Sequence, residues 1–125
     1  MSQATTVNLY IENYDGDPND IVYELPLILS DDDDNPFPNL EGAYGSFNVK
    51  SFMGSEERLI EVSTPNNIQF NSSTGEMIIT LRVSDMSNIR KDIAEQTFIY
   101  DIDILDSTGR FFRLLKGEVV IGGDA

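Results

Sequence analysis

Acidic side chains are the residues of this 125-residue chain with the clearest capacity for chemistry. One cluster is Asp15, Asp17 and Asp20 in the segment DGDPND, and a second is the run DDDDN at 31–35. Calcium takes about six to eight oxygen ligands, which closely spaced acids on a flexible loop can donate. The first cluster lacks the spacing and closing glutamate of an EF-hand, and like-charged loops are commonly just solvated. Solvated loops are therefore the preferred interpretation, with a calcium site at Asp15, Asp17 and Asp20 as the alternative.

A further pair of acids, Asp101 and Asp103, falls on one face of an alternating, strand-like run. Strand geometry predicts a separation of roughly 6.5–7 Å between them. Two carboxylates near each other can in principle perform glycoside hydrolysis. Alternating acids are equally typical of the solvent face of any half-exposed strand, which is the preferred interpretation. We assign no catalytic residue and expect a protein that is not an enzyme.

The chain contains neither histidine nor cysteine. Histidine is the commonest general base and metal ligand, and cysteine supplies disulfides and the thiolates of structural zinc sites. Those classes of site are excluded by composition. We expect no cofactor.

The balance of charge is strongly acidic, with 22 Asp and Glu against 8 Lys and Arg and a formal net charge of −14. Phosphate contacts require basic residues, so nucleic-acid binding is not expected, and an anionic membrane surface would repel the chain. No apolar run approaches the roughly 20 residues of a membrane helix, and the start, MSQATTVNLY, has no signal-peptide pattern. Two interpretations of the charge remain open: solubility, or electrostatic matching to a basic partner.

Period-2 alternation of apolar and polar residues dominates the chain and predicts an all-β fold. In the run at 20–30, Ile21, Tyr23, Leu25, Leu27 and Leu29 share one face, and Pro26 indicates an edge strand or a bulge. Several short strands separated by turn residues are typical of an antiparallel sandwich or barrel. The predicted strands lie within residues 6–13, 20–30, 45–52, 58–63, 67–71, 75–84, 97–105 and 111–123.

The connections are predicted from their residue types. Met86, Ile89 and Ile93 recur at helical spacing and predict one or two helical turns that cross between the sheets. Gly75 and Gly109 are placed to close hairpin loops. Gly117 lies inside a strand pattern and predicts a bulge or close packing. The segment 30–45 has no strand signal and is expected to be a surface excursion of a single domain that spans residues 1–125.

Four aromatic residues lie in less regular stretches and are candidate interface anchors, since aromatic side chains often carry binding energy between proteins. Core packing or isolated exposure is the alternative for each. The chain has no tryptophan, the strongest sugar-stacking platform. The candidates are Tyr10, Tyr14, Phe37 and Tyr44.

The C-terminal half carries an ordered set of motifs. NIQFNSSTGEMIITLRVSDMSNI, residues 67–89, leads through a polar turn to QTFIYDIDILDSTGRFFRLLKGEVVI, residues 96–121. Over roughly 66–122 the chain resembles small tailed-phage structural proteins with an immunoglobulin-like β-sandwich, related to the N-terminal domain of baseplate upper proteins. The first half lacks that family's early strand pair. The matching residues are Gly75, Ile79, Leu81, Phe98, Tyr100, Asp101, Ile102, Asp106, Gly109, Arg113, Leu114, Leu115, Gly117, Val119 and Ile121.

The resemblance implies an antiparallel immunoglobulin-like β-sandwich and a non-enzymatic virion protein. Such a protein would be a structural or adaptor component of the baseplate, tail or neck, or a capsid accessory, assembled in the host cytoplasm. Its partners would be other virion proteins, within a multimeric assembly. The alternative function is a ligand-binding β-sandwich, such as a carbohydrate-binding or calcium-dependent adhesion module.

Overall fold

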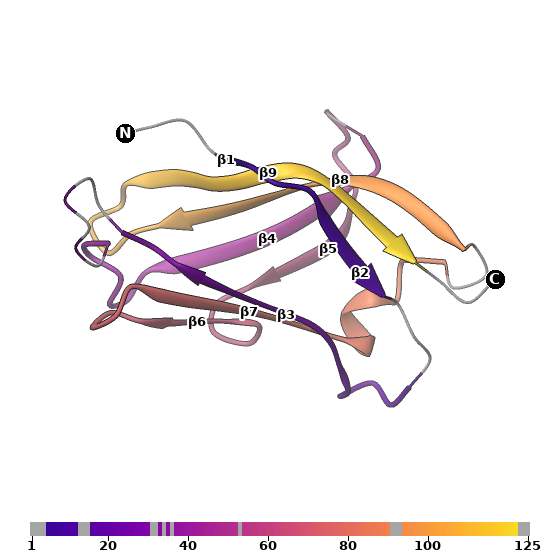
Figure 1. Ribbon diagram of the computed structural model, residues 1–125, viewed down its shortest axis with the longest axis horizontal. Coiled ribbons are helices and arrows are strands. Elements are labelled where there is room, and N and C mark those ends of the chain that lie inside the picture. The colour runs from indigo at the N-terminus through magenta and orange to yellow at the C-terminus, as the bar shows by residue number, and fades with distance from the viewer. Residues whose placement is uncertain are drawn as a thin grey trace.

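The computed structural model describes residues 5–12, 16–30, 33, 35, 37–52, 54–90 and 94–122. The strands among these residues form two layers that pack face to face (Figure 1). The elements are β1 (Thr5–Thr6), β2 (Leu9–Glu12), β3 (Ile21–Ile28), β4 (Tyr44–Lys50), β5 (Arg58–Ser63), β6 (Ile68–Asn71), β7 (Glu76–Arg82), the 3-10 turn η1 (Val83–Met86), β8 (Glu95–Leu105) and β9 (Phe111–Gly122).

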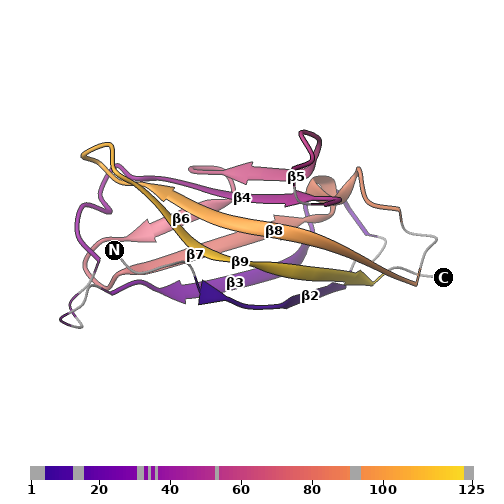
Figure 2. The ribbon, with the colours of Figure 1, turned by 90° about the horizontal axis from the view of Figure 1, so that it is seen from above.

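The larger sheet has the order β5–β4–β8–β9, and β1 and β2 both pair with the remaining edge of β9. The smaller sheet has the order β3–β7–β6, and Figure 2 shows the larger sheet lying across it. The smaller sheet matches strands B, E and D of an immunoglobulin domain, and β4, β8 and β9 match strands C, F and G. The predicted all-β, immunoglobulin-like β-sandwich with one short helical turn is confirmed.

One pairing differs from the purely antiparallel arrangement that we predicted. β1 and β2 run parallel to β9, with Thr5 opposite Leu115 and Ile11 opposite Ile121, so the larger sheet is mixed. This pairing covers an edge of β9 that would otherwise present unpaired N–H and C=O groups. It also carries Leu9 and Ile11, which are buried, into the space between the sheets.

Along the central strands, side chains alternate between the core and the outer face, as predicted. Phe47 of β4 is fully buried, and its ring lies 5.8 Å from that of Tyr100, measured between centroids. A side chain of this size contributes about 1.5–3 kcal/mol when it is buried, so the inward set fixes the register of the strands. The buried inward residues of β7 and β8 are Met77, Ile79, Leu81, Tyr100, Ile102 and Ile104.

The first residue of β3 departs from the predicted face. Ile21 lies opposite Arg82 and Tyr23 lies opposite Leu81, so one extra residue stands between them as a β-bulge. The bulge reverses the alternation, because side chains in a strand have a period of two. Ile21 is consequently 50% exposed, whereas Tyr23 packs against the core as predicted. β3 is an edge strand, as Pro26 indicated.

Most described residues of the segment 30–45 are exposed, but a few side chains of this segment pack inward. Leu40 and Ala43 are buried and form a second, smaller core with Ile104 and Phe112. Phe37 joins this group, with its ring edge-on to Phe112 at 5.1 Å between centroids. The segment therefore closes one end of the sandwich.

The short helical turn η1 follows β7 directly, as predicted. Met86 and Ile89 are buried in the main core, and Ile93 lies outside the described residues. One Asp85 carboxylate oxygen accepts hydrogen bonds of 2.8 Å from the Arg82 backbone N–H and from the Asn67 side chain. This carboxylate therefore ties the turn both to the end of β7 and to the β5–β6 loop, which contains Asn67.

The final hairpin turns at residues 106–110, where sequence reasoning placed Gly109. Gly109 has φ +89°, a conformation that favours glycine. The Asp106 carboxylate accepts hydrogen bonds from the Thr108 side chain and from the backbone N–H groups of Thr108 and Arg110. These bonds hold the pKa of Asp106 below its ordinary value.

Gly117 of β9 is the point where the N-terminal segment comes closest to the sheet. It has φ +153°, and a Cβ placed on it would lie 2.3 Å from the Val7 carbonyl oxygen. That same oxygen accepts a 2.6 Å hydrogen bond from the Tyr100 hydroxyl. The sequence predicted either close packing or a bulge at Gly117, and close packing is confirmed. The register shift between β8 and β9 lies at another position, between Ile102 and Asp103 of β8.

Replacing Tyr100 with Phe removes the hydroxyl that holds the Val7 carbonyl. We expect a loss of about 1 kcal/mol in the free energy of unfolding, measured by urea denaturation. Burial, reinforced by Tyr23, raises the pKa of Tyr100 from 10.0 to about 12. The wild-type chain should therefore lose stability as the pH rises through this window, and the variant should lose less. Tyr23→Phe is the control, and equal losses in both variants would contradict a specific role for the bond.

Candidate interaction surface

An exposed apolar group crosses the outer face of the larger sheet at one end. Tyr44 lies opposite Leu105, and Leu105 lies opposite Phe111, so the three residues form one row over β4, β8 and β9. Their exposed fractions are 51%, 43% and 60%. Single exposed apolar residues are ordinary, but a contiguous group typically marks a contact site. We call Tyr44, Leu105 and Phe111 the apolar ladder.

An ion-pair network lies next to the apolar ladder on the same face. The Arg113 Nε and Nη2 atoms donate to the two Asp103 carboxylate oxygens at 2.8 and 3.3 Å, and Nη2 lies 3.8 Å from Asp101. The Asn48 side chain donates a 3.2 Å hydrogen bond to Asp101. Arg113 is half exposed and reaches toward the Phe111 ring, 6.0 Å from its centroid. The network therefore joins β4, β8 and β9 and supports the ladder from one side.

Asp103 is the most buried acid of this network, with 8% of the residue exposed. Burial raises the pKa of Asp103 because desolvation disfavours the carboxylate, and the hydrogen bonds from Arg113 oppose that rise. Sequence reasoning placed Asp101 and Asp103 on one face, which the structure confirms, but it predicted two solvated acids. The Arg113 side chain covers Asp103, so the pair is bound in an ion-pair network.

A second partly exposed row crosses the same face toward its other end. Tyr10 lies opposite Val120, and Val120 lies opposite Thr97, so β2, β9 and β8 contribute one residue each. Tyr10 is 57% exposed, and its hydroxyl would lie 2.5 Å from a Cβ placed on Gly122. The ring therefore extends along β9 over this glycine. We call Tyr10, Val120 and Thr97 the Tyr10 row.

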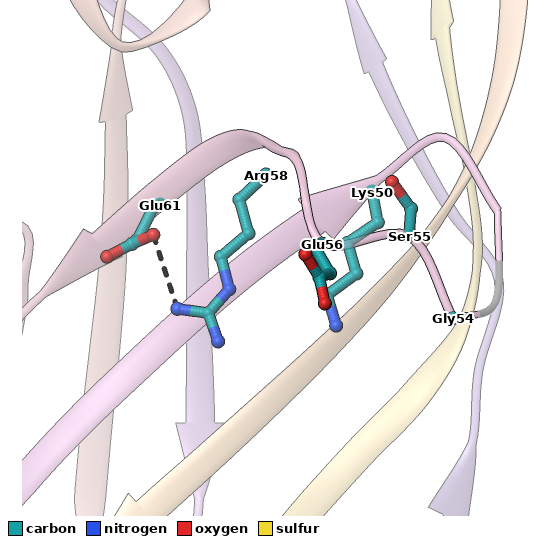
Figure 3. Close-up of a pocket in the computed structure, with 6 residues that line it drawn as sticks. All are labelled: Lys50, Gly54, Ser55, Glu56, Arg58 and Glu61. Carbon is teal, nitrogen blue, oxygen red and sulfur yellow. Dashed lines mark ion pairs between the residues drawn. The ribbon is translucent and has the colours of Figure 1, made fainter.

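Charged side chains occupy the corner formed by β4 and β5 (Figure 3). Arg58 and Glu61 of β5 form an exposed ion pair with a distance of 3.2 Å between nitrogen and oxygen. Lys50 lies opposite Arg58 in the register and lines the same open depression, together with Glu56 from the β4–β5 loop. This corner is polar and carries both signs of charge.

The four aromatic candidates from the sequence have different positions. Tyr10 and Tyr44 both lie on the outer face of the larger sheet and are more than half exposed. Phe37 is half-buried against Phe112, so its packing is accounted for within the chain. Tyr14 lies outside the described residues. Tyr10 and Tyr44 thus remain candidate anchors, at opposite ends of one face.

Of the acidic candidates for calcium, the structure describes Asp17 and Asp20, which lie away from this face. Asp17 and Asp20 are exposed in one turn, where the Asp20 carboxylate accepts a 3.1 Å hydrogen bond from the Asp17 backbone N–H. Asp15 lies outside the described residues, as do Asp31, Asp32 and Asp34. Among the residues that the structure does describe, no group of three acids is placed to hold a metal ion.

Leu105 and Phe111 were not recognised as surface residues from the sequence. The sequence did contain a signal for Leu105, because positions 101, 103 and 105 share one face of the strand and the first two are acidic. Phe111 likewise precedes Phe112 and Arg113 in a run whose alternation puts positions 111 and 113 on one face. What the sequence does not show is that Tyr44, more than 60 positions earlier, completes the same row.

Comparisons with known proteins add no relative to these observations. No family model matches the chain, and no curated protein matches it. None of the helical segments among the described residues is long and apolar enough to span a membrane.

Proposed function

We propose that this chain is a non-enzymatic structural or adaptor protein of a tailed-phage virion that acts through contacts with neighbouring subunits. The observation that carries the contact role is the apolar ladder, which presents three adjacent apolar side chains to solvent on a rigid sheet. Large apolar groups at such positions are stabilised by a partner that removes them from water. The virion setting rests on the resemblance of residues 66–122.

Several of the residues that carry the resemblance have specific structural roles in this chain, which supports treating them as a motif. Asp106 and Gly109 form the turn between β8 and β9, Arg113 holds Asp103, and Gly117 admits the N-terminal segment. Each task depends on the particular residue type rather than on hydrophobicity. A baseplate, tail or neck position and a capsid accessory role are all compatible with this motif.

The proposed function is tested by mass spectrometry of density-purified phage particles from the source sample. We expect the chain in the particles at a fixed ratio to the major capsid protein. A ratio close to one would indicate a capsid accessory, and a few to tens of copies per particle would indicate the tail, neck or baseplate. Absence from clean particles would overturn the proposal.

A ligand-binding β-sandwich is the second candidate, because the exposed Tyr44 and Phe111 rings offer stacking surfaces on one face. A glycan array, probed with and without calcium, distinguishes the two functions. Specific glycan binding that Phe111→Ser abolishes would favour the ligand-binding module. An array without binding, together with presence in particles, would favour the virion protein.

A further inference from the structure

We propose that the outer face of the larger sheet binds the same face of a second copy of this chain. The inference deepens the proposed function and rests on it for its biological setting. Three features of the face favour this contact: its distribution of charge, the positions of its two apolar rows, and its size.

The charge of this face differs from that of the whole chain. Between the apolar ladder and the Tyr10 row, the outward positions of β4, β5, β8 and β9 hold four bases and four acids, so this area is neutral. The whole chain carries a net charge of −14, and the next outward positions beyond the Tyr10 row, Glu12 of β2 and Glu95 of β8, are both acidic. The eight residues are Lys50, Arg58, Arg113, Lys116, Glu61, Asp101, Asp103 and Glu118.

This distribution selects a second copy over a strongly charged partner. Two copies repel each other over most of their acidic surfaces, and the repulsion is smallest where each presents a neutral face. The four bases of this face would repel a strongly basic partner. Such a partner would instead be attracted to the more acidic parts of the chain. A mixed-sign face is complementary to itself when bases can lie opposite acids across a two-fold axis.

The apolar rows fit such a two-fold arrangement. The apolar ladder lies at one end of the face and the Tyr10 row toward the other, with the Arg113 network between them. In an isologous dimer whose strands run in opposite directions, the ladder of each copy meets the Tyr10 row of its partner. Phe111 of one copy would then contact Tyr10 of the other, and this contact would occur twice.

The size of the face predicts a weak dimer. Leu105 and Thr97 are eight positions apart along β8, which corresponds to roughly 27 Å, and the three spacings between four strands correspond to roughly 14 Å. A face of this size falls at or below the ~800 Å² per partner of a standard interface. We therefore expect dissociation constants on the order of tens of micromolar, with dimers favoured where copies are concentrated by an assembly.

Sedimentation equilibrium on the purified chain tests the inference, at about 50 mM and about 500 mM NaCl. We expect a monomer–dimer equilibrium that tightens at the higher salt, because screening weakens the repulsion between two chains of charge −14. A chain that stays monomeric at millimolar concentration would overturn the inference. A net weakening of association with added salt would also overturn it, because the repulsion between two chains of charge −14 should outweigh the few base–acid pairs across the face.

The position of the interface is tested by Phe111→Ser, which we expect to weaken dimerisation at least about tenfold. Ile28→Ser is the matched control, because Ile28 is 69% exposed on β3 of the other sheet. Equal effects of the two substitutions would overturn the assignment of the face. Thermal melts of both variants verify that they fold.

The pairing of the two rows is tested by a double-mutant cycle. If Tyr10 and Phe111 meet across the interface, Tyr10→Ser should weaken the dimer, and adding Phe111→Ser should have a clearly smaller effect than it has alone. Additive effects would overturn the two-fold arrangement. The particle measurement is independent of these outcomes, so a monomeric chain found in virions would refute the dimer and leave the proposed function standing.

Discussion

Replacing Gly117 with alanine is expected to lower the free energy of unfolding by about 3 kcal/mol or more. The added Cβ would lie 2.3 Å from the Val7 carbonyl oxygen, a backbone atom that cannot rotate away. The N-terminal segment would have to move off β9, which would also break the hydrogen bond from the Tyr100 hydroxyl to that oxygen. Urea denaturation followed by circular dichroism measures the loss.

The matched control for this substitution is Gly109→Ala. Gly109 also has a positive φ, +89°, but a Cβ placed there meets no atom within 4 Å. Its substitution should cost only the backbone strain, about 1 kcal/mol. If both alanine variants lose the same stability, the close approach of Val7 to Gly117 does not constrain the fold as described.

Replacing Arg113 with methionine is expected to cost about 2 kcal/mol at neutral pH, below the ~3–5 kcal/mol of a fully buried pair because Arg113 is half exposed. The substitution leaves Asp103, which is 8% exposed, without its cationic partner and next to Asp101. Urea denaturation at neutral and acidic pH gives the size of the loss and its pH dependence.

The pH dependence of this variant follows from the pKa of Asp103, which burial raises. Without Arg113 that pKa should rise further. Because the pKa of this carboxyl group is higher in the folded state, the folded state holds the proton more tightly than the unfolded state, which stabilises the fold at low pH. This contribution is lost as the pH rises from the unfolded pKa, about 3.9, through the folded one. Arg113→Met should therefore lose more stability at neutral pH than at about pH 4.

Arg58→Met is the control for Arg113→Met. The two arginine side chains have similar exposed fractions, 45% and 47%, but the partner of Arg58, Glu61, is itself 60% exposed. A surface pair of this kind contributes at most about 1 kcal/mol, so a small loss is expected. A loss as large and as pH-dependent as that of Arg113→Met would show that burial of Asp103 is not the cause.

The fold could be predicted from the sequence wherever alternation was long and uninterrupted. The seven residues of β7 and the inward positions of β8 could be assigned to strands directly from the sequence, because each inward position is apolar. A glycine marks the turn before β7 and the turn after β8. The prediction was wrong for Ile21, because a bulge changes the face of a side chain without changing its residue type. The direction of β2 was equally invisible, since alternation has the same appearance in parallel and antiparallel strands.

The candidate surface was predicted only in part, for a different physical reason. Tyr10 and Tyr44 were selected as aromatic residues outside the regular pattern, and both are exposed. Leu105 and Phe111 were missed because a surface row is assembled across strands, and it depends on a register that no single strand encodes. Burial of Asp103 was missed likewise, because the covering Arg113 comes from the neighbouring strand.

The parallel pairing of β2 with β9 has a consequence for how the chain folds. The Asn8 side chain accepts a hydrogen bond from the Glu118 backbone N–H, across 110 positions of sequence. During synthesis, Leu9 and Ile11 are made early, yet their place in the sheet exists only after β9 has left the ribosome. Contacts between such distant positions slow folding, because the entropy of closing the long loop is lost before they form. Docking of the N-terminal strand should therefore be a late step, and refolding rates should respond less to Leu9→Ala than unfolding rates do.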